Sequence, residues 1–287
     1  MTQKVGVIGL GDIGRGVATN VARAGLELFV CDIRPEATAA FGETATVATS
    51  PAELAASVDV VVVCVLDDAQ VESVLTGDHG ALSSMKPAAT VLVLSTITTA
   101  AVKRMADKAI EAGVELVDCG VSGGPVAAQE GELVAMVGGS DEAVERVRPV
   151  IDSFASVVLH MGPPGAGLQA KLARNIVQYG SWLAAYEGQR LAEAAGIDLS
   201  KLATAIRESD AKIGGASRLM FRDTVEPFPP NTDVRLTDAM RAGANLAHKD
   251  LRAALALAGD LGVTLPMTEL AEELCDDVFG LRSAKDG

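Results

Sequence analysis

The stretch Val5-Gly6-Val7-Ile8-Gly9-Leu10-Gly11-Asp12-Ile13-Gly14 decides the fold of this 287-residue chain. A short apolar run leads into the pattern Gly-x-Gly-x-x-Gly, and a helical pattern begins at Ile13. In a strand–turn–helix unit the first glycine permits a tight turn, the second lets a pyrophosphate approach the backbone, and the third lets the helix pack closely on the strand. The stretch therefore predicts a dinucleotide site at a helix N-terminus, formed by Gly9, Leu10, Gly11, Asp12, Ile13 and Gly14.

The end of the next expected strand bears on which dinucleotide binds. That strand ends at Asp32, where an acid accepts hydrogen bonds from the adenosine ribose of NAD. Arg34 follows two residues later, and its guanidinium could pair with the 2′-phosphate of NADP. A carboxylate beside that phosphate repels it, so we expect NAD as the cofactor, with NADP as the alternative. The alternative to a dinucleotide site is a glycine turn in a sheet protein that binds nothing.

The first half of the chain alternates apolar runs with helical stretches. Strands are expected over residues 4–9, 27–32, 59–65, 90–95, 114–118, 133–137 and 157–160. Helices are expected over residues 13–24, 35–41, 52–57, 69–75, 98–112 and 141–154. Nearly continuous Val/Leu strands are typical of a parallel sheet covered on both faces, so a doubly wound sheet is predicted.

The pattern changes after Gly162-Pro163-Pro164-Gly165, because long Ala/Leu-rich helical stretches replace the strands. Helices are expected over residues 166–195, 199–208, 236–261 and 266–279. The predicted fold is therefore α/β: an N-terminal doubly wound Rossmann domain, residues 1–163, and an all-α C-terminal domain, residues 164–287, joined by a long helix. The helical domain is expected to serve the substrate and oligomerisation.

Composition excludes several classes of protein. With 24 Lys and Arg against 38 Asp and Glu, the net charge of −14 gives no general attraction to nucleic acid. No apolar run approaches the roughly 20 residues that span a bilayer. The N-terminus carries no signal-like segment, so a cytoplasmic protein is expected. The four cysteines and three histidines are scattered, which predicts neither a disulfide framework nor a metal site.

Two further groups of polar residues are candidates for a substrate site. Ser122-Gly123-Gly124, soon after the expected strand 114–118, can form a nest of backbone N–H groups for a substrate carboxylate, or a structural turn. One face of the long helix carries a stripe that either meets a ligand or is merely solvated: Lys171, Arg174, Asn175 and Gln178. A later helix repeats this spacing with Arg241, Asn245 and Lys249.

Several motifs, in their order and spacing, resemble the β-hydroxyacid dehydrogenases, which include 3-hydroxyisobutyrate dehydrogenase and tartronate semialdehyde reductase. The motifs are residues 9–14, 95–97, 121–133 and 165–167, Lys171 with Asn175, and residues 249–251. The resemblance implies that Ser122, Gly123 and Gly124 hold the substrate carboxylate. It also implies that Lys171 is the catalytic acid/base and that Asn175 orients the substrate. Lys249 is then placed near nicotinamide and substrate, and Thr96 and Leu66 contact the cofactor.

Three positions depart from the family pattern. Gly120 stands where proline is usual, Asp67 follows Leu66 where a Leu-Pro pair is common, and Arg174 replaces the first residue of an Asn-Asn pair. Arg174 adds a fixed cation near Lys171, which either binds a second anionic group or points to solvent or a neighbouring subunit. The resemblance also implies a homodimer or homotetramer built through the helical domain.

The leading hypothesis is an NAD-dependent oxidoreductase that acts on the 3-hydroxyl of a small 3-hydroxy acid, or reduces the matching semialdehyde. A non-catalytic dinucleotide sensor is one alternative, since a Rossmann domain without chemistry does not need Lys171. An imine reductase is another, and Lys171 at the catalytic position argues against it. The sequence does not select one 3-hydroxy acid.

Overall fold

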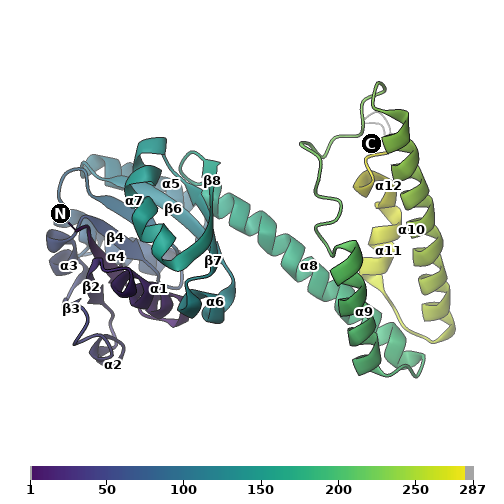
Figure 1. The fold of residues 1–287 in the computed structure, drawn as a ribbon, viewed down its shortest axis with the longest axis horizontal. Helices are drawn as coiled ribbons and strands as arrows, with labels where there is room; N and C mark the ends of the chain where they lie inside the picture. Colours follow the sequence, from purple (N-terminus) through teal and green to yellow (C-terminus); the bar gives the residue numbers. More distant parts are fainter. Residues whose placement is uncertain (1, 282–287) are drawn as a thin grey trace. The chain divides into compact units, whose positions relative to one another are not determined.

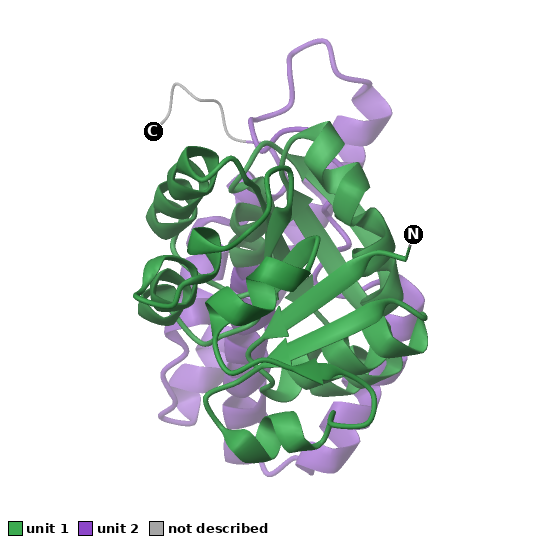
Figure 2. Cartoon of the chain, turned by 90° about the vertical axis from the view of Figure 1, so that its left-hand side faces the viewer, with its two compact units in different colours: residues 1–174 green, residues 175–287 purple. Residues whose placement is uncertain are grey.

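The computed structural model describes residues 2–281 and separates into two compact units, residues 1–174 and residues 175–287 (Figure 2). Unit 1 holds every strand of the described chain, and unit 2 is helical (Figure 1). The predicted fold class, an α/β Rossmann domain followed by helices, is confirmed. The expected domain boundary at residues 163/164 precedes the long helix and stays a prediction. No helix within residues 2–281 is long and apolar enough to cross a membrane.

Unit 1 is built on one eight-stranded sheet in the order β3-β2-β1-β4-β5-β6-β7-β8. The strands are β1 (Lys4–Ile8), β2 (Glu27–Cys31), β3 (Thr46–Val47), β4 (Val60–Val63), β5 (Thr90–Val93), β6 (Glu115–Ser122), β7 (Leu133–Gly138) and β8 (Ala155–Gly162). All neighbours pair in parallel except β6 and β7, which are antiparallel. Only residues 123–132 join β6 to β7, and a parallel crossover needs a longer connection.

Helices cover both faces of this sheet (Figure 1). They are α1 (Asp12–Arg23), α2 (Pro35–Ala39), α3 (Pro51–Ser57), α4 (Asp68–Thr76), α5 (Thr99–Glu111), α6 (Gly124–Glu130) and α7 (Asp141–Phe154), with a 3₁₀ turn, η1 (Ala81–Ser83). Side chains alternate along each strand, so Val60 and Val62 pack with α1 and α7, while Val61 and Val63 pack with α3, α4 and α5. Both faces are therefore apolar, as the continuous Val/Leu runs predicted.

Two details of unit 1 differ from the sequence-based expectation. The strand expected over residues 114–118 runs on to Ser122, because antiparallel pairing with β7 satisfies its backbone as far as the pair Ser122 and Val134. Residues 119–122, which follow the expected strand, are thus part of it. Helix α6 was not expected, and it begins directly after Gly123.

The second half of the chain consists of α8 (Ala166–Ala194), α9 (Leu199–Ile213), α10 (Val234–Asp260), α11 (Pro266–Glu273) and α12 (Cys275–Val278). The helix expected over residues 266–279 is broken at Leu274 into α11 and α12. Among residues 175–281 the buried apolar side chains are few and mostly small: Ala192, Ala244, Ala258, Leu265 and Cys275. Unit 2 therefore has little hydrophobic core within one chain.

Candidate active site

The glycine-rich loop between β1 and α1 has the geometry of a pyrophosphate site. Gly9 adopts a φ of +91°, and a Cβ at Gly14 would lie 1.9 Å from the carbonyl oxygen of Gly9. Gly11, by contrast, is exposed, and a Cβ built there would meet no atom within 4 Å. The loop is thus tightly packed inside and open on its outer side, where Asp12 and Ile13 begin α1 and their backbone N–H groups have no partner within the helix. These features fit the phosphates of a dinucleotide.

The Asp32 carboxylate ties this loop to the end of β2. Its Oδ2 accepts the N–H of Leu10 at 2.6 Å, and its two oxygens accept the guanidinium of Arg34 at 3.0 and 3.1 Å. Burial acts to raise the pKa of Asp32, but the hydrogen bonds from Arg34 and from Leu10 outweigh it and lower that pKa to about 2. The acid is therefore ionised at neutral pH. The ion pair between Asp32 and Arg34 was not expected from sequence.

Leu66 and Thr96 follow β4 and β5 at the same edge of the sheet as the glycine loop. Both residues are exposed, and the Leu66 side chain retains 78% of its accessible surface. The buried Ser95 hydroxyl accepts the N–H of Val65 at 2.9 Å, which links the two loops. The carboxyl ends of parallel strands form the ligand-binding edge of such sheets, so this location suits contact with a bound cofactor.

Three residues of β6 at alternate positions share one face of the strand: Asp118, Gly120 and Ser122. Helix α8 begins against this face, since Asp118 accepts N–H groups from Gly165 and Leu168. A Cβ at Gly120 would lie only 2.5 Å from the Cβ of Lys171. The structure therefore seats Lys171 on the strand face that also carries Ser122.

Lys171 has an environment suited to proton transfer. The residue is half-buried, and burial lowers the pKa of its ammonium, with a further lowering by the charge of Arg174. A lysine base needs such a lowered pKa, because its ordinary value of about 10.4 keeps it protonated at neutral pH. Asn175 and Gln178 follow on the same face of α8, at one and two turns from Lys171.

Gly123 and Gly124 complete the turn after Ser122. Their φ angles are +134° and +75°, in the region that favours glycine, and a Cβ at Gly123 would lie 2.6 Å from that of Ala127. Successive backbone N–H groups in such turns can converge on an anion. Ser122 is partly exposed beside them. The segment thus has the form expected of a carboxylate nest, at the end of the strand that carries Gly120.

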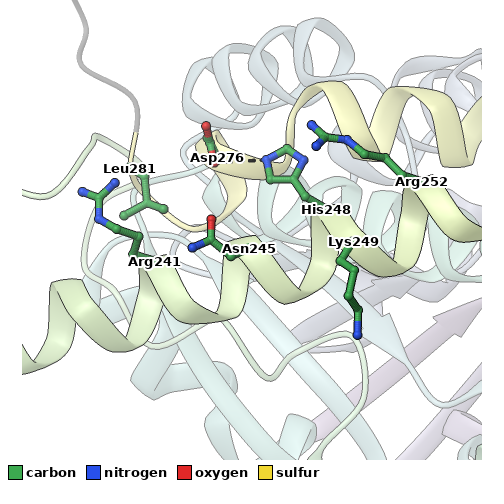
Figure 3. A pocket seen from close by; sticks show the side chains of 7 residues that line it. All are labelled: Arg241, Asn245, His248, Lys249, Arg252, Asp276 and Leu281. Atoms are coloured by element: carbon green, nitrogen blue, oxygen red, sulfur yellow. Dashed lines mark hydrogen bonds and ion pairs between the residues drawn. The ribbon is translucent and has the colours of Figure 1, made fainter.

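Within unit 2, Lys249 lies on α10 beside a cavity shown in Figure 3. The cavity is lined by Arg241, Asn245, His248, Lys249, Arg252, Asp276 and Leu281. His248 bonds to Glu272 at 2.9 Å and to Asp276 at 3.3 Å, which joins α10 to α11 and to α12. The spacing of Arg241, Asn245 and Lys249 indicated this helix face from sequence. The contacts of His248 with Glu272 and Asp276 were missed, because these residues lie 24 and 28 positions away in the sequence.

Sequence reasoning also missed the contribution of Asp118. Asp118 lies at the end of the expected strand 114–118, and the sequence predicts no role for it. The sequence signal for Asp118 is a carboxylate inside an otherwise apolar strand. In the structure this residue has no exposed surface. Buried acids need partners, so this pattern alone calls for donors from elsewhere in the chain. Which donors those are was decided by the packing of α8.

Comparison with known proteins shows which family this chain resembles. A family model described as the NAD binding domain of 6-phosphogluconate dehydrogenase matches residues 4–162. A second model, described as NAD-binding of NADP-dependent 3-hydroxyisobutyrate dehydrogenase, matches residues 165–285. The 2-hydroxy-3-oxopropionate reductase of Escherichia coli is 32% identical, over 94% of this chain and 89% of its own. An uncharacterised oxidoreductase of Mycobacterium tuberculosis is 41% identical, over 94% of this chain and 91% of its own.

Solved structures similar to this chain also include oxidoreductases. The crystal structure of a candidate oxidoreductase from Mycobacterium avium is 38% identical, with a TM-score of 0.90 over 98% of this chain and 99% of that one. An imine reductase from Pseudomonas sp. has a TM-score of 0.73 at 20% identity, over 96% of this chain and 93% of its own, which concerns the fold alone. The two family models and the relatives matched over most of their length show that this chain belongs to the β-hydroxyacid dehydrogenase family of NAD(P)-binding oxidoreductases.

Proposed function

We propose that this protein oxidises the 3-hydroxyl group of a small 3-hydroxy acid by transfer of a hydride from the carbon that bears it to NAD, or reduces the matching semialdehyde. The observation that carries the proposal is the placement of Lys171. It is half-buried, its pKa is lowered, and it lies on the face of β6 that ends in Ser122 and the Gly123-Gly124 turn. A proton-transfer group thus stands beside a candidate carboxylate site.

In this proposal each site residue has its own role. Ser122, Gly123 and Gly124 bind the substrate carboxylate through the hydroxyl and backbone N–H groups. The neutral amine of Lys171 takes the proton from the reacting hydroxyl during oxidation, and its ammonium returns a proton to the carbonyl oxygen during reduction. Bound nicotinamide supplies the hydride chemistry. By the family resemblance, Asn175 orients the reacting oxygen and Lys249 is a residue near nicotinamide and substrate.

NAD is the proposed cofactor, with Asp32 as the acceptor for its adenosine ribose. The loop residues 9–14 receive the pyrophosphate, Leu66 contacts the nicotinamide, and Thr96 contacts the cofactor. Arg34 is engaged by Asp32 through two hydrogen bonds, so binding of a 2′-phosphate requires that this ion pair opens. This arrangement favours NAD and leaves NADP as the second choice.

The proposal includes a homodimer or homotetramer formed through unit 2. One stripe of α8 has the 3,4 spacing of helix-packing positions and is exposed in the single chain: Ile176, Tyr179, Leu183 and Tyr186. Exposed apolar patches of this kind mark interaction surfaces. We also propose the cytoplasm as the compartment, because all four cysteines are free thiols.

Replacement of the lysine tests the proposed function. Lys171→Ala should lower kcat by about 10² to 10⁴, the usual contribution of a positioned acid/base, while the Kd for NAD changes only slightly. Lys171→Arg should not restore activity, because guanidinium stays protonated. Initial rates with NAD and NADP across a panel of 3-hydroxy acids, and Kd by calorimetry, provide the measurements.

Three results would contradict the proposal. If Lys171→Ala keeps a kcat close to wild type while hydride transfer limits the rate, Lys171 is not the acid/base. If no 3-hydroxy acid or semialdehyde reacts with either cofactor although NAD binds tightly, the protein is a dinucleotide sensor. Turnover of cyclic imines in place of hydroxy acids would assign it to the imine reductases.

A further inference from the structure

A buried carboxylate lies behind the proposed catalytic lysine, and the chemistry above does not use it. Asp118 on β6 has no exposed surface. Its Oδ2 accepts the N–H of Leu168 at 2.7 Å, and its Oδ1 accepts the N–H of Gly165. These donors belong to the start of α8, where backbone N–H groups have no partner within the helix. Lys171 follows Leu168 by three residues, about one turn.

The contact between α8 and the sheet leaves no spare room. A Cβ at Gly120 would lie 2.5 Å from the Cβ of Lys171 and 3.0 Å from the carbonyl oxygen of Gly167. A Cβ at Gly138, on the neighbouring strand β7, would lie 2.5 Å from Oδ1 of Asp118. The missing side chains at Gly120 and Gly138 allow the first turn of α8 to reach the carboxylate.

We propose that Asp118 is a positioning residue, which anchors the first turn of α8 on β6 and thereby holds Lys171 half-buried on the strand face that carries Ser122. This inference rests on the proposed acid/base role of Lys171. Burial raises the pKa of Asp118, and the N–H donors of α8 act against that rise. Two N–H groups aimed at two oxygens fix both the distance and the rotation of the helix start.

Loss of the hydrogen bonds from α8 to Asp118 should change the pKa of Lys171, which a general loss of folding stability would not do. If the first turn of α8 moves away from β6, the ammonium of Lys171 regains water. Since burial is the main cause of its lowered pKa, that pKa then rises toward the ordinary value for lysine. The rising limb of kcat/KM against pH for hydroxy acid oxidation, which reports the free base, must then move to higher pH.

Asp118→Asn is the first test, because it keeps the size but replaces one acceptor oxygen with an NH₂ group that faces an N–H donor. We expect kcat to fall about ten- to hundredfold, as for a small misplacement of a catalytic group. We also expect the limb to shift to higher pH, with the Kd for NAD nearly unchanged. Asp198→Asn is the matched control, since Asp198 accepts the N–H groups of Ser200 and Lys201 at the start of α9. It should leave kcat and the limb unchanged.

Gly120→Ala tests the same geometry while Asp118 is retained, and it decides the matter if Asp118→Asn does not fold. The new methyl group would lie 2.5 Å from the Cβ of Lys171, so β6 and the first turn of α8 must move apart, and the same fall in kcat and the same shift of the limb are expected. The inference is overturned if a folded variant keeps the wild-type limb, whether or not kcat falls. If Lys171→Ala is inactive in that case, the proposed function still stands, whereas an active Lys171→Ala refutes the proposed function itself.

Discussion

At the residue scale, the proposed cofactor site predicts that the ion pair between Asp32 and Arg34 governs which dinucleotide is preferred. Asp32 is almost fully covered, whereas the Arg34 side chain is half exposed, so the arginine is the partner that can move. A 2′-phosphate would have to compete with Asp32 for the guanidinium and would also meet the repulsion of the carboxylate. In the proposed site, cofactor choice is therefore a competition between two anions, the Asp32 carboxylate and the 2′-phosphate, for the Arg34 guanidinium.

This competition predicts the effect of changing either partner. Asp32→Ala should shift the ratio of kcat/KM toward NADP by at least tenfold, about 1.4 kcal/mol, because it removes repulsion and frees Arg34. The double variant Asp32→Ala with Arg34→Ala should lose most of that gain. Steady-state kinetics with both cofactors measure the ratio. A wild type that already prefers NADP tenfold would show that Arg34 dominates the site.

At the scale of elements, helix α11 is held by a side chain from another helix. Glu187 of α8 is buried, and its carboxylate accepts the N–H groups of Met267 and Thr268 at 2.8 and 2.9 Å and the hydroxyl of Thr268 at 2.7 Å. Leu265, the residue that precedes α11, provides no side-chain cap. The glutamate therefore supplies the cap that α11 lacks locally.

Glu187→Gln should lower the free energy of unfolding by about 1–3 kcal/mol at neutral pH, because one buried N–H then faces an amide NH₂. Burial acts to raise the pKa of Glu187, but its three hydrogen bonds outweigh burial and lower it. Because the pKa of Glu187 is lower in the folded state than its unfolded value of about 4.3, the ionised carboxylate stabilises the folded protein above that pH. This contribution to stability is lost as the pH falls through the folded-state pKa. The difference between wild type and variant should thus shrink in acid.

Urea unfolding near neutral pH and near pH 4 measures this difference, and Glu193→Gln on the exposed side of α8 is the control. The control should match wild type at both pH values, since no hydrogen bond of α11 involves it. An equal loss of stability for Glu187→Gln at both pH values would show that the charge of Glu187 does not contribute.

At the scale of the whole molecule, the two units differ in how they bury apolar surface. Unit 1 has a packed layer on each side of its sheet. Unit 2 leaves large apolar side chains of α8 exposed, including Trp182 at 59% and Ile176 at 74%. Burying such side chains contributes about 1.5–3 kcal/mol each. A second copy of the chain that covers this stripe would supply the core that one chain lacks.

Association can be followed through Trp182, the single tryptophan of the chain. Light scattering after gel filtration should show at least two chains per particle for wild type. Leu183→Asp should raise the dissociation constant at least tenfold, because loss of one buried leucine costs about 1.5–3 kcal/mol. The Trp182 emission should then shift to longer wavelength on dilution.

Ile110→Asp is the matched control for this prediction. Ile110 is a large apolar residue of α5 in unit 1 and is 70% exposed, so the new charge should leave the mass and the Trp182 emission unchanged. A monomeric wild type at micromolar concentration would contradict the proposed oligomer.

The sequence alone determined the features that depend on short stretches of chain. The apolar strands, the glycine loop of residues 9–14 and the acid at Asp32 predicted a Rossmann domain with an NAD(P) site, and the resemblance of later motifs predicted the family. These predictions succeeded because strand alternation, tight turns and helix starts depend on neighbouring residues. The roles of Lys171 and of the Ser122 nest remain predictions from that resemblance.

Only the tertiary structure decided how distant parts of the chain meet. Asp118 finds its donors 47 and 50 residues later, and Glu187 caps a helix 80 residues away. The reversal of β7 against β6 and the seat of Lys171 over Gly120 likewise depend on which surfaces pack together. A buried carboxylate needs hydrogen-bond donors, but the local sequence does not show which residues supply them. The donors are backbone N–H groups, which every residue except proline carries.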